Sequence, residues 1–203
     1  MSGGFNNASG GYASISGGRN NVASGDYSFV GGGGGEMAED GNTAFGHYSA
    51  VLGGSYNIAG DSDLIDHTLG SQSSVSGGFN NITYGRYASI SGGNSNSIYG
   101  DSASVSGGLA NLVRGQYASV SGGQGNIANG EAASVSGGIT NSAAGNWSSV
   151  SGGHENSADN FYASVSGGFG NRAQAQSSSV SGGFFRYVTG DYDWAAGGLY
   201  QDQ

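Results

Sequence analysis

The sequence of 203 residues contains no cysteine, no proline and no lysine, and only 9% of its residues are charged. Without cysteine there can be no disulfide framework. The absence of cysteine is compatible with both oxidising and reducing compartments and does not distinguish them. Five arginines against 14 acidic residues give a net charge of −9, and the arginines lie far apart in the chain. Because a nucleic acid requires clustered basic residues, we expect no nucleic-acid partner. No apolar run approaches membrane-spanning length, so we expect no membrane contact from this chain.

What the sequence has in abundance is glycine, 44 residues of it, mostly in pairs that mark a repeat. The tetrapeptide Val/Ile-Ser-Gly-Gly starts every 15 residues from Val75 to Val180 without a slip, and Ala195 continues the register. Ile15 and Val30 keep the same spacing near the N-terminus. A fixed period of this length is the sequence signature of a solenoid.

The positions within the 15-residue cell predict its local structure. Around each Val or Ile, apolar or small residues alternate with serines, as in Ala88-Ser89-Ile90. An alternation with a period of two is typical of a β-strand. Six residues after the Val comes an Asn, followed by a second alternation of the type Asn-x-Ala-x-Gly. We therefore expect two short strands and two glycine-rich turns per cell, stacked as an all-β parallel solenoid with about 4.8 Å between coils.

Two columns of the repeat need an interpretation. The Asn column (Asn81, Asn96, Asn111, Asn126, Asn141, Asn156, Asn171) is expected to hydrogen-bond along the stack, which is a structural role. An aromatic column contains Tyr12, Tyr27, Tyr48, Tyr87, Tyr117, Trp147, Tyr162 and Tyr192. These rings either stack for assembly or offer a platform for a sugar or protein ligand, and regular spacing favours assembly. The missing proline fits as well, because every coil must donate its amides to the next.

The cell Ser-Val-Ser-Gly-Gly-x-x-Asn-x-Ala-x-Gly resembles the head repeat of YadA-like trimeric autotransporter adhesins, best from Ser74 to Gly190. Ser-Gly replaces the family's Ala-Ile after the Val, and Asn replaces a Ser. The resemblance implies a left-handed parallel β-roll, three of which assemble as a homotrimer. It also implies a place at the cell surface, anchored in the outer membrane or carried on an extracellular fibre. A thin core of Val and Ala independently suggests that several rolls pack together.

The repeat divides the chain into a β-roll head over residues 1–190, with regular coils over 75–190, and a C-terminal cap or neck over 191–203. Since Met1 leads directly into the repeat, we expect the natural chain to continue upstream, and a stalk to follow the neck. Two insertions interrupt the register, near 33–40 and near 61–70. Binding residues are expected where a repeat is violated, because regular coils are scaffold.

The insertions supply the candidate ligand-binding residues, which are Glu36, Glu39, Asp40, Asp61, Asp63, Leu64, Asp66 and His67. Asp61, Asp63 and Asp66 could bind Ca²⁺ through oxygen, but they do not complete a known loop, and an exposed acidic loop is the favoured interpretation. Whether a metal binds is left open, and no cofactor is expected. His47 and His154 occupy variable positions and are expected to face solvent. No nucleophile–base pair stands out, so we expect no catalytic residues and no enzyme.

The sequence thus predicts a surface adhesin or fibre head that attaches cells to a host, prey or matrix protein or to a glycan. The alternative is a structural spacer, as in a phage tail fibre, with ligand binding elsewhere. A polysaccharide enzyme would require paired carboxylates in a cleft, which only the insertions could supply. An ice-binding solenoid is disfavoured, because its regular Thr columns are missing and the recurrent hydroxyl is Ser.

Overall fold

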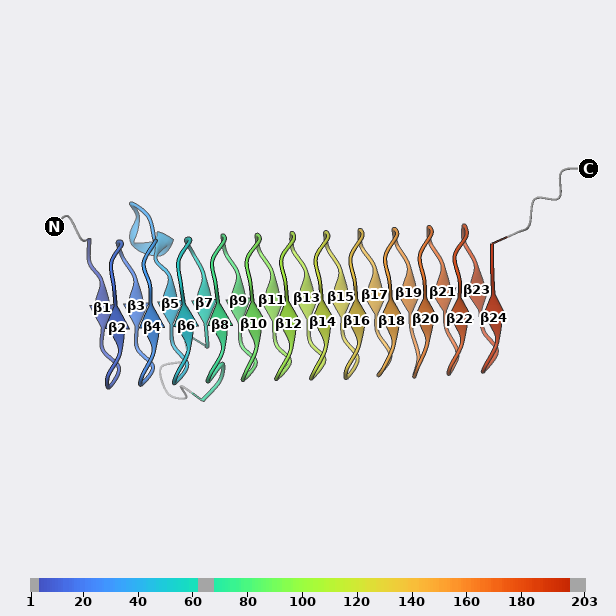
Figure 1. The fold of residues 1–203 in the computed structure, drawn as a ribbon, viewed down its shortest axis with the longest axis horizontal. Helices are drawn as coiled ribbons and strands as arrows, with labels where there is room; N and C mark the ends of the chain where they lie inside the picture. Colours follow the sequence, from blue (N-terminus) through green and yellow to red (C-terminus); the bar gives the residue numbers. More distant parts are fainter. Residues whose placement is uncertain (1–3, 62–67, 198–203) are drawn as a thin grey trace, which may run out of the picture.

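The computed structural model describes residues 4–61 and 68–197, which form a parallel β-solenoid with one strand of each coil in each of two 12-stranded sheets (Figure 1). The first sheet contains β1 (Asn7–Ala8), β3 (Val22–Ala23), β5 (Thr43–Ala44), β7 (Ile58–Ala59), β9 (Ile82–Thr83), β11 (Ser97–Ile98), β13 (Leu112–Val113), β15 (Ile127–Ala128), β17 (Ser142–Ala143), β19 (Ser157–Ala158), β21 (Arg172–Ala173) and β23 (Tyr187–Val188). The second contains β2 (Ser14–Ile15), β4 (Phe29–Val30), β6 (Ala50–Val51), β8 (Ser74–Val75), β10 (Ser89–Ile90), β12 (Ser104–Val105), β14 (Ser119–Val120), β16 (Ser134–Val135), β18 (Ser149–Val150), β20 (Ser164–Val165), β22 (Ser179–Val180) and β24 (Trp194–Ala195).

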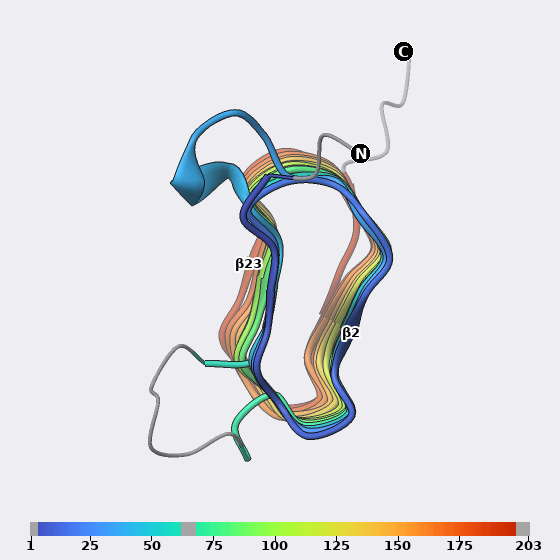
Figure 2. The ribbon, with the colours of Figure 1, turned by 90° about the vertical axis from the view of Figure 1, so that its left-hand side faces the viewer.

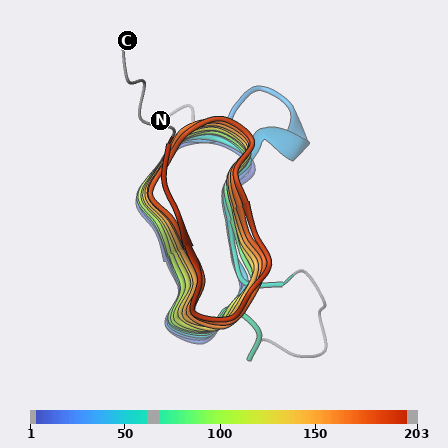
Figure 3. The ribbon, with the colours of Figure 1, turned by 90° about the vertical axis from the view of Figure 1, so that its right-hand side faces the viewer.

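The strands pair in the register that the sequence period predicts. Ser89 pairs with Ser104 and Ile90 with Val105, and the same 15-residue offset runs through the regular coils. Viewed along the rod, the coils superpose as a flattened ring with one sheet on each side (Figures 2 and 3). The expectation of an all-β parallel solenoid with 15-residue coils is therefore confirmed.

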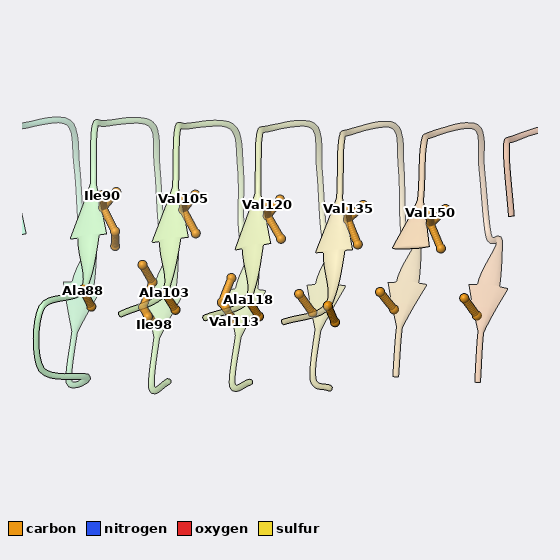
Figure 4. Close-up of a cluster of buried hydrophobic side chains, with 14 of the residues drawn as sticks. Ala88, Ile90, Ile98, Ala103, Val105, Val113, Ala118, Val120, Val135 and Val150 are labelled. Carbon is orange, nitrogen blue, oxygen red and sulfur yellow. The ribbon is translucent and has the colours of Figure 1, made fainter. Parts of the chain in front are cut away.

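A narrow apolar core runs along the axis between the two sheets (Figure 4). The second sheet contributes the Val column, the first sheet a column of Ala, Val, Ile or Thr, and the turn between them a column of Ala or Ser. Val105, Ile98 and Ala103, which represent the three columns, are each at most 1% exposed. A single chain therefore closes its own core, and any case for oligomerisation must rest on side chains outside it.

The Asn column is buried and connects neighbouring coils, which confirms its structural role. The Asn126 side-chain amide donates to the carbonyl oxygens of Gly122 in its own coil and Gly138 in the next, at 2.9 and 3.0 Å. Its Oδ1 accepts the backbone N–H of Asn141 at 2.9 Å. Each Asn side chain thus forms hydrogen bonds with backbone groups of its own coil and of the next. These bonds satisfy the polar atoms of a side chain that is buried away from water.

The glycine pairs form one of the two turns, and the two members of a pair have different roles. Gly93 has a φ of +91°, and a Cβ there would lie 2.3 Å from the carbonyl oxygen of Gly108. Gly92 has open space at the same point. Only the second glycine of this pair is required by the close approach of the next coil.

At the opposite turn, the aromatic column adopts a backbone conformation that the sequence does not predict. Tyr87 and Tyr117 have φ values of 58° and 60°, in the left-handed region that non-glycine residues rarely occupy. Ser102 and Ala132 at the same position share it, with φ values of 57° and 51°. The turn geometry is therefore imposed by the stacking of coils and not by the residue type.

Both insertions leave the stack in register. Gly34 donates its N–H to the Gly54 carbonyl oxygen in the next coil, as Phe79 donates to Gly93 in a regular coil. Gly34 therefore still occupies its regular position, and the six extra residues that follow it are 35–40. They include one turn of 3₁₀ helix, η1 (Ala38–Asp40). Gly60 and Gly70 occupy adjacent positions of the regular cell, so the second insertion covers 61–69. At the C-terminal end, β24 continues the second sheet, and the expected neck beyond residue 197 lies outside the described residues.

Candidate functional site

The first insertion projects from the rod on the side of the first sheet (Figure 2). It is attached to the preceding coil by the Asn20 side-chain amide, which donates to the carbonyl oxygens of Gly35 and Met37 at 3.1 and 2.7 Å. Glu36 and Glu39 are exposed, and Met37 is 66% exposed. The candidate residues Glu36 and Glu39 are therefore available to a ligand on a segment with a defined conformation.

Asp40, the third candidate of this insertion, is already engaged within the chain. Its Oδ2 accepts the backbone N–H of Met37 at 3.0 Å. A hydrogen bond from the Tyr56 hydroxyl, more than the Met37 amide, lowers the pKa of the Asp40 carboxyl below its usual value. The same hydrogen bond raises the pKa of Tyr56. Asp40 therefore stabilises the insertion, and Tyr56 is a partner that sequence reasoning missed.

Replacement of Tyr56 by Phe is expected to move the pKa of Asp40 upward, toward that of an ordinary aspartate. Because the folded-state pKa of Asp40 is lowered, its contribution to stability is present above the unfolded pKa and is lost as the pH falls through the folded one. NMR titration of the Asp40 carboxyl carbon in both proteins measures the shift. Tyr117→Phe, at an exposed ring outside this contact, is the control and leaves the Asp40 titration in place. An unchanged Asp40 pKa in Tyr56→Phe would contradict the assignment.

Of the second insertion, Asp61 and residues 68–69 are described. Asp61 lies close enough to Tyr84 to contribute, after burial and Tyr99, to the raised pKa of the Tyr84 hydroxyl. The candidate residues Asp63, Leu64, Asp66 and His67 lie outside the described residues, and their role stays a prediction. The first insertion precedes β5 and the second follows β7, so the two leave the first sheet at opposite ends of its strands (Figure 2). The structure does not bring Asp40 and Asp61 together.

Other charged and imidazole side chains form contacts between coils. Arg86 and Asp101, at the same position of successive coils, form an ion pair at 2.6 Å, and Asp101 also accepts the Arg86 backbone N–H. This pair lowers the pKa of Asp101 and raises that of Arg86. His47 accepts the backbone N–H of Asp26 through Nδ1 at 3.0 Å. Within residues 4–61 and 68–197 there is no group of three or more acidic or histidine side chains placed to hold a metal ion.

The aromatic column forms stacks where consecutive coils carry rings. Tyr12 and Tyr27, and Tyr27 and Tyr48, have ring centroids 4.9 Å apart, and Trp147 stacks on Tyr162 at 5.3 Å. Within these stacks the facing ring surfaces cover each other, so only ring edges and the ends of a stack remain for a ligand. The structural interpretation is therefore favoured for the stacked rings, whereas Tyr87 and Tyr117 have no ring neighbour in the column and are exposed.

A second set of apolar side chains lies outside the core, where Tyr99 is exposed and the others are half-buried. On the outer face of the first sheet lie Ile82, Tyr84, Tyr99, Leu112 and Ile127, which we call the apolar strip. Tyr84 and Tyr99 stack at 4.8 Å, and Tyr99 is 51% exposed. The sequence contains a partial signal, because the residue after the Asn is apolar in three of these four coils, with Ser97 as the exception. Strand alternation alone does not distinguish these residues from scaffold.

No family model matches the chain, and no curated protein matches its sequence. In the described part of the chain there is also no helix with the length and apolar character needed to cross a membrane.

Proposed function

We propose that this chain is the head or a fibre segment of a trimeric surface adhesin, in which three left-handed rolls associate side by side and attach a cell to a protein or glycan ligand. One observation carries the proposal: a weakly charged rod exposes rows of aromatic and aliphatic side chains outside its closed core. Exposed apolar surface of this kind is typical of protein association sites. The resemblance to YadA-like heads supports the trimer and the location at the cell surface.

The apolar strip is the surface best suited to association between copies. It lies in coils without insertions, on the sheet whose outward residues are half-buried Ile82, Leu112 and Ile127. Further along, the same column becomes Ser142, Ser157 and Arg172. This polar continuation favours a spacer role for the C-terminal coils, as in a fibre whose ligand binds elsewhere.

Attachment would then come from the projecting first insertion, with its exposed Glu36, Met37 and Glu39. A trimer presents three copies of each site, and several trimers on one surface add avidity to a low affinity per site. The acidic side chains favour a ligand with basic groups, such as a basic segment of a host or matrix protein.

The test is the mass in solution together with binding to a matrix-protein and glycan array. The wild type is expected to sediment as a 60 kDa species, three times the 20.0 kDa of one chain. Tyr99→Lys with Leu112→Lys is expected to give a monomer and, through loss of avidity, weaker array binding. Gln116→Lys with Gln124→Lys, at exposed turn positions of two coils, is the matched control. A monomeric wild type would contradict the trimer.

A second variant tests the attachment site without disturbing the stack. Deletion of residues 35–40 joins Gly34 to Gly41 and restores the 15-residue spacing, so the coils are expected to remain intact. Array binding should fall while the mass stays that of the wild-type assembly. Unchanged binding would place the ligand site outside the first insertion, and no array binding by the wild type would contradict adhesion by this segment.

A further inference from the structure

The aromatic column is interrupted in three coils, where a small residue lies between the rings of the coils before and after it. The three triplets are Tyr87, Ser102 and Tyr117; Tyr117, Ala132 and Trp147; and Tyr162, Ser177 and Tyr192. We call the space over the small residue of each triplet a ring slot. The rings beside the slots are between 44% and 74% exposed, so the slots open to solvent.

The backbone places all members of the column alike, whether they carry a ring or not. Ser102 and Ala132 have φ values of 57° and 51°, in the same left-handed region as Tyr117 at 60°. They also join the same hydrogen-bond ladder: Ser102 donates its N–H to the Arg86 carbonyl oxygen at 2.7 Å, as Tyr117 does to Asp101 at 3.0 Å. A small residue therefore does not displace the column, and it leaves room for one ring.

The N-terminal coils show what fits a space of this width. There Tyr27 lies between Tyr12 and Tyr48, with ring centroids 4.9 Å apart on both sides and interplanar angles of 13° and 1°. A span of two coils, about 9.6 Å, thus holds one six-membered ring stacked on both faces. The rings beside a slot can rotate, and stacking on a guest ring would select the orientation that Tyr12 and Tyr48 adopt around Tyr27.

Each slot also has a carboxylate at its edge, on the residue before the small residue or before the second ring. These carboxylates belong to Asp101, Glu131 and Asp191. Asp101 forms the ion pair with Arg86 at 2.6 Å, and Asp191 accepts the Gln176 backbone N–H at 3.1 Å. A ligand that fits a slot must therefore be apolar on both faces and able to form hydrogen bonds around its rim.

A pyranose sugar has this distribution of groups. Its C–H bonds carry a partial positive charge and stack on the negative faces of aromatic rings, and its hydroxyl groups can bond to carboxylate and guanidinium groups. A nucleobase would bring phosphate groups, which the net charge of −9 disfavours. An aromatic side chain from a partner would cover the charged edge groups without offering them hydrogen bonds.

Contact on both faces also selects the configuration of the sugar. In β-glucose every ring substituent is equatorial, so both faces present only C–H groups. Galactose and mannose each carry an axial hydroxyl group, which projects from one face and would hold an aromatic ring away. The bonds to further sugars lie in the plane of the ring, so a glycan chain would leave the slot across the rod and not along it.

We infer that each ring slot binds one pyranose of glucose configuration, sandwiched between two rings of the aromatic column and hydrogen-bonded by the carboxylate at its edge. Three weak sites on one chain add avidity toward a surface with many such sugars. The slots lie at the turn that follows the strands of the first sheet, whereas the first insertion lies at the other turn (Figure 2). The inference goes beyond the proposed function, because it depends on neither the trimer nor the insertion.

The experiment is saturation-transfer NMR of the full chain with methyl β-glucoside as the probe. The wild type is expected to saturate the protons on both faces of the sugar ring to a similar extent, because each face contacts an aromatic ring. Methyl β-galactoside and methyl α-mannoside are expected to bind about tenfold more weakly or less. No binding of the glucoside, saturation of a single face, or equal binding of the three sugars would overturn the inference.

A variant with filled slots tests the site directly. It carries Ser102→Tyr, Ala132→Tyr and Ser177→Tyr. Because the column already holds tyrosines at positive φ, this variant is expected to fold with a continuous stack and to lose the probe signal. The matched control carries Ser95→Tyr, Ala110→Tyr and Thr140→Tyr, at positive-φ positions of the opposite turn, and is expected to retain the signal. A full signal from the filled variant would overturn the inference.

Tyr117→Ala keeps the test decisive if the filled variant does not fold. This exposed ring borders two of the three slots, so its removal is expected to leave about one third of the probe signal with an unchanged circular dichroism spectrum. An unchanged signal would contradict the inference. So would a smaller molar mass of the filled variant than of the wild type, because the rings of a second copy would then occupy the slots.

Two variants already described separate this inference from the proposed function. Tyr99→Lys with Leu112→Lys, and deletion of residues 35–40, are both expected to keep the full glucoside signal. Loss of the trimer or of the attachment site therefore leaves the slots intact, and the two proposals fail separately.

Discussion

Asn126→Ala is expected to destabilise the solenoid by about 3 kcal/mol or more, a large fraction of the stability of an ordinary domain. The substitution removes three side-chain hydrogen bonds, two donated to Gly122 and Gly138 and one accepted from Asn141. The Gly138 oxygen keeps the hydrogen bond from the Gln124 N–H. The half-buried Gly122 oxygen and the buried Asn141 N–H lose their partner, and a buried unsatisfied group costs about 1–3 kcal/mol. Urea unfolding followed by circular dichroism measures the loss.

Gln124→Ala is the matched control for this variant, because Gln124 lies in the same coil and is exposed. Its effect should stay within about 0.5 kcal/mol, as is usual for surface positions. Asn126→Asp should be at least as damaging as the Ala variant, because a carboxylate cannot donate to the two carbonyl oxygens and buries a charge. If both Asn126 variants unfolded at the wild-type urea concentration, the Asn column would not hold the coils together.

The second large effect is expected from the glycine pair. Gly93→Ala should cost about 3 kcal/mol or more, since a left-handed conformation costs 1–2 kcal/mol and the new Cβ adds an overpacking cost of 1–3 kcal/mol. That Cβ would lie 2.3 Å from the Gly108 oxygen and 2.7 Å from the Asn96 amide nitrogen, so relief requires a shift of the neighbouring coil. Thermal unfolding under identical conditions compares this protein with the wild type.

Gly92→Ala is the control at the neighbouring position. It distinguishes a steric clash with the next coil from a general effect of replacing a glycine by alanine in this turn. No heavy atom lies within 4 Å of a Cβ built at Gly92, so this variant should unfold near the wild-type temperature or slightly above it. Equal losses in the two variants would mean that the second glycine is not selected by the approach of the next coil.

The fold was predictable because one period controls every level of structure. The spacing from Val75 to Val180 fixed the register, and the alternation around Ile90 fixed which residues enter the core. The backbone at Tyr87 and Tyr117 was not predictable, because no residue preference signals positive φ for tyrosine. There the hydrogen bonds of adjacent coils determine the turn, such as the one from Tyr117 N–H to the Asp101 carbonyl oxygen at 3.0 Å.

The sequence predicted where in the chain the candidate sites lie, but not which residues their side chains contact. The register breaks located both insertions, and the exposure of Glu36 and Glu39 agrees with a surface segment. Tyr56 as the partner of Asp40 could not be read from the sequence, since it depends on how six extra residues fold back on a neighbouring coil.

The stacking of two-residue strands also determines how the rod would respond to tension. Each coil is held to the next by a similar set of backbone hydrogen bonds and one Asn, and coils further apart share little contact. A force along the axis would therefore pull on the hydrogen bonds between neighbouring coils. The terminal coil is held on one side only, so it would detach before the others. Every coil that opens would release about 45 Å of chain, so the rod can lengthen stepwise and limit the load on whatever it is attached to.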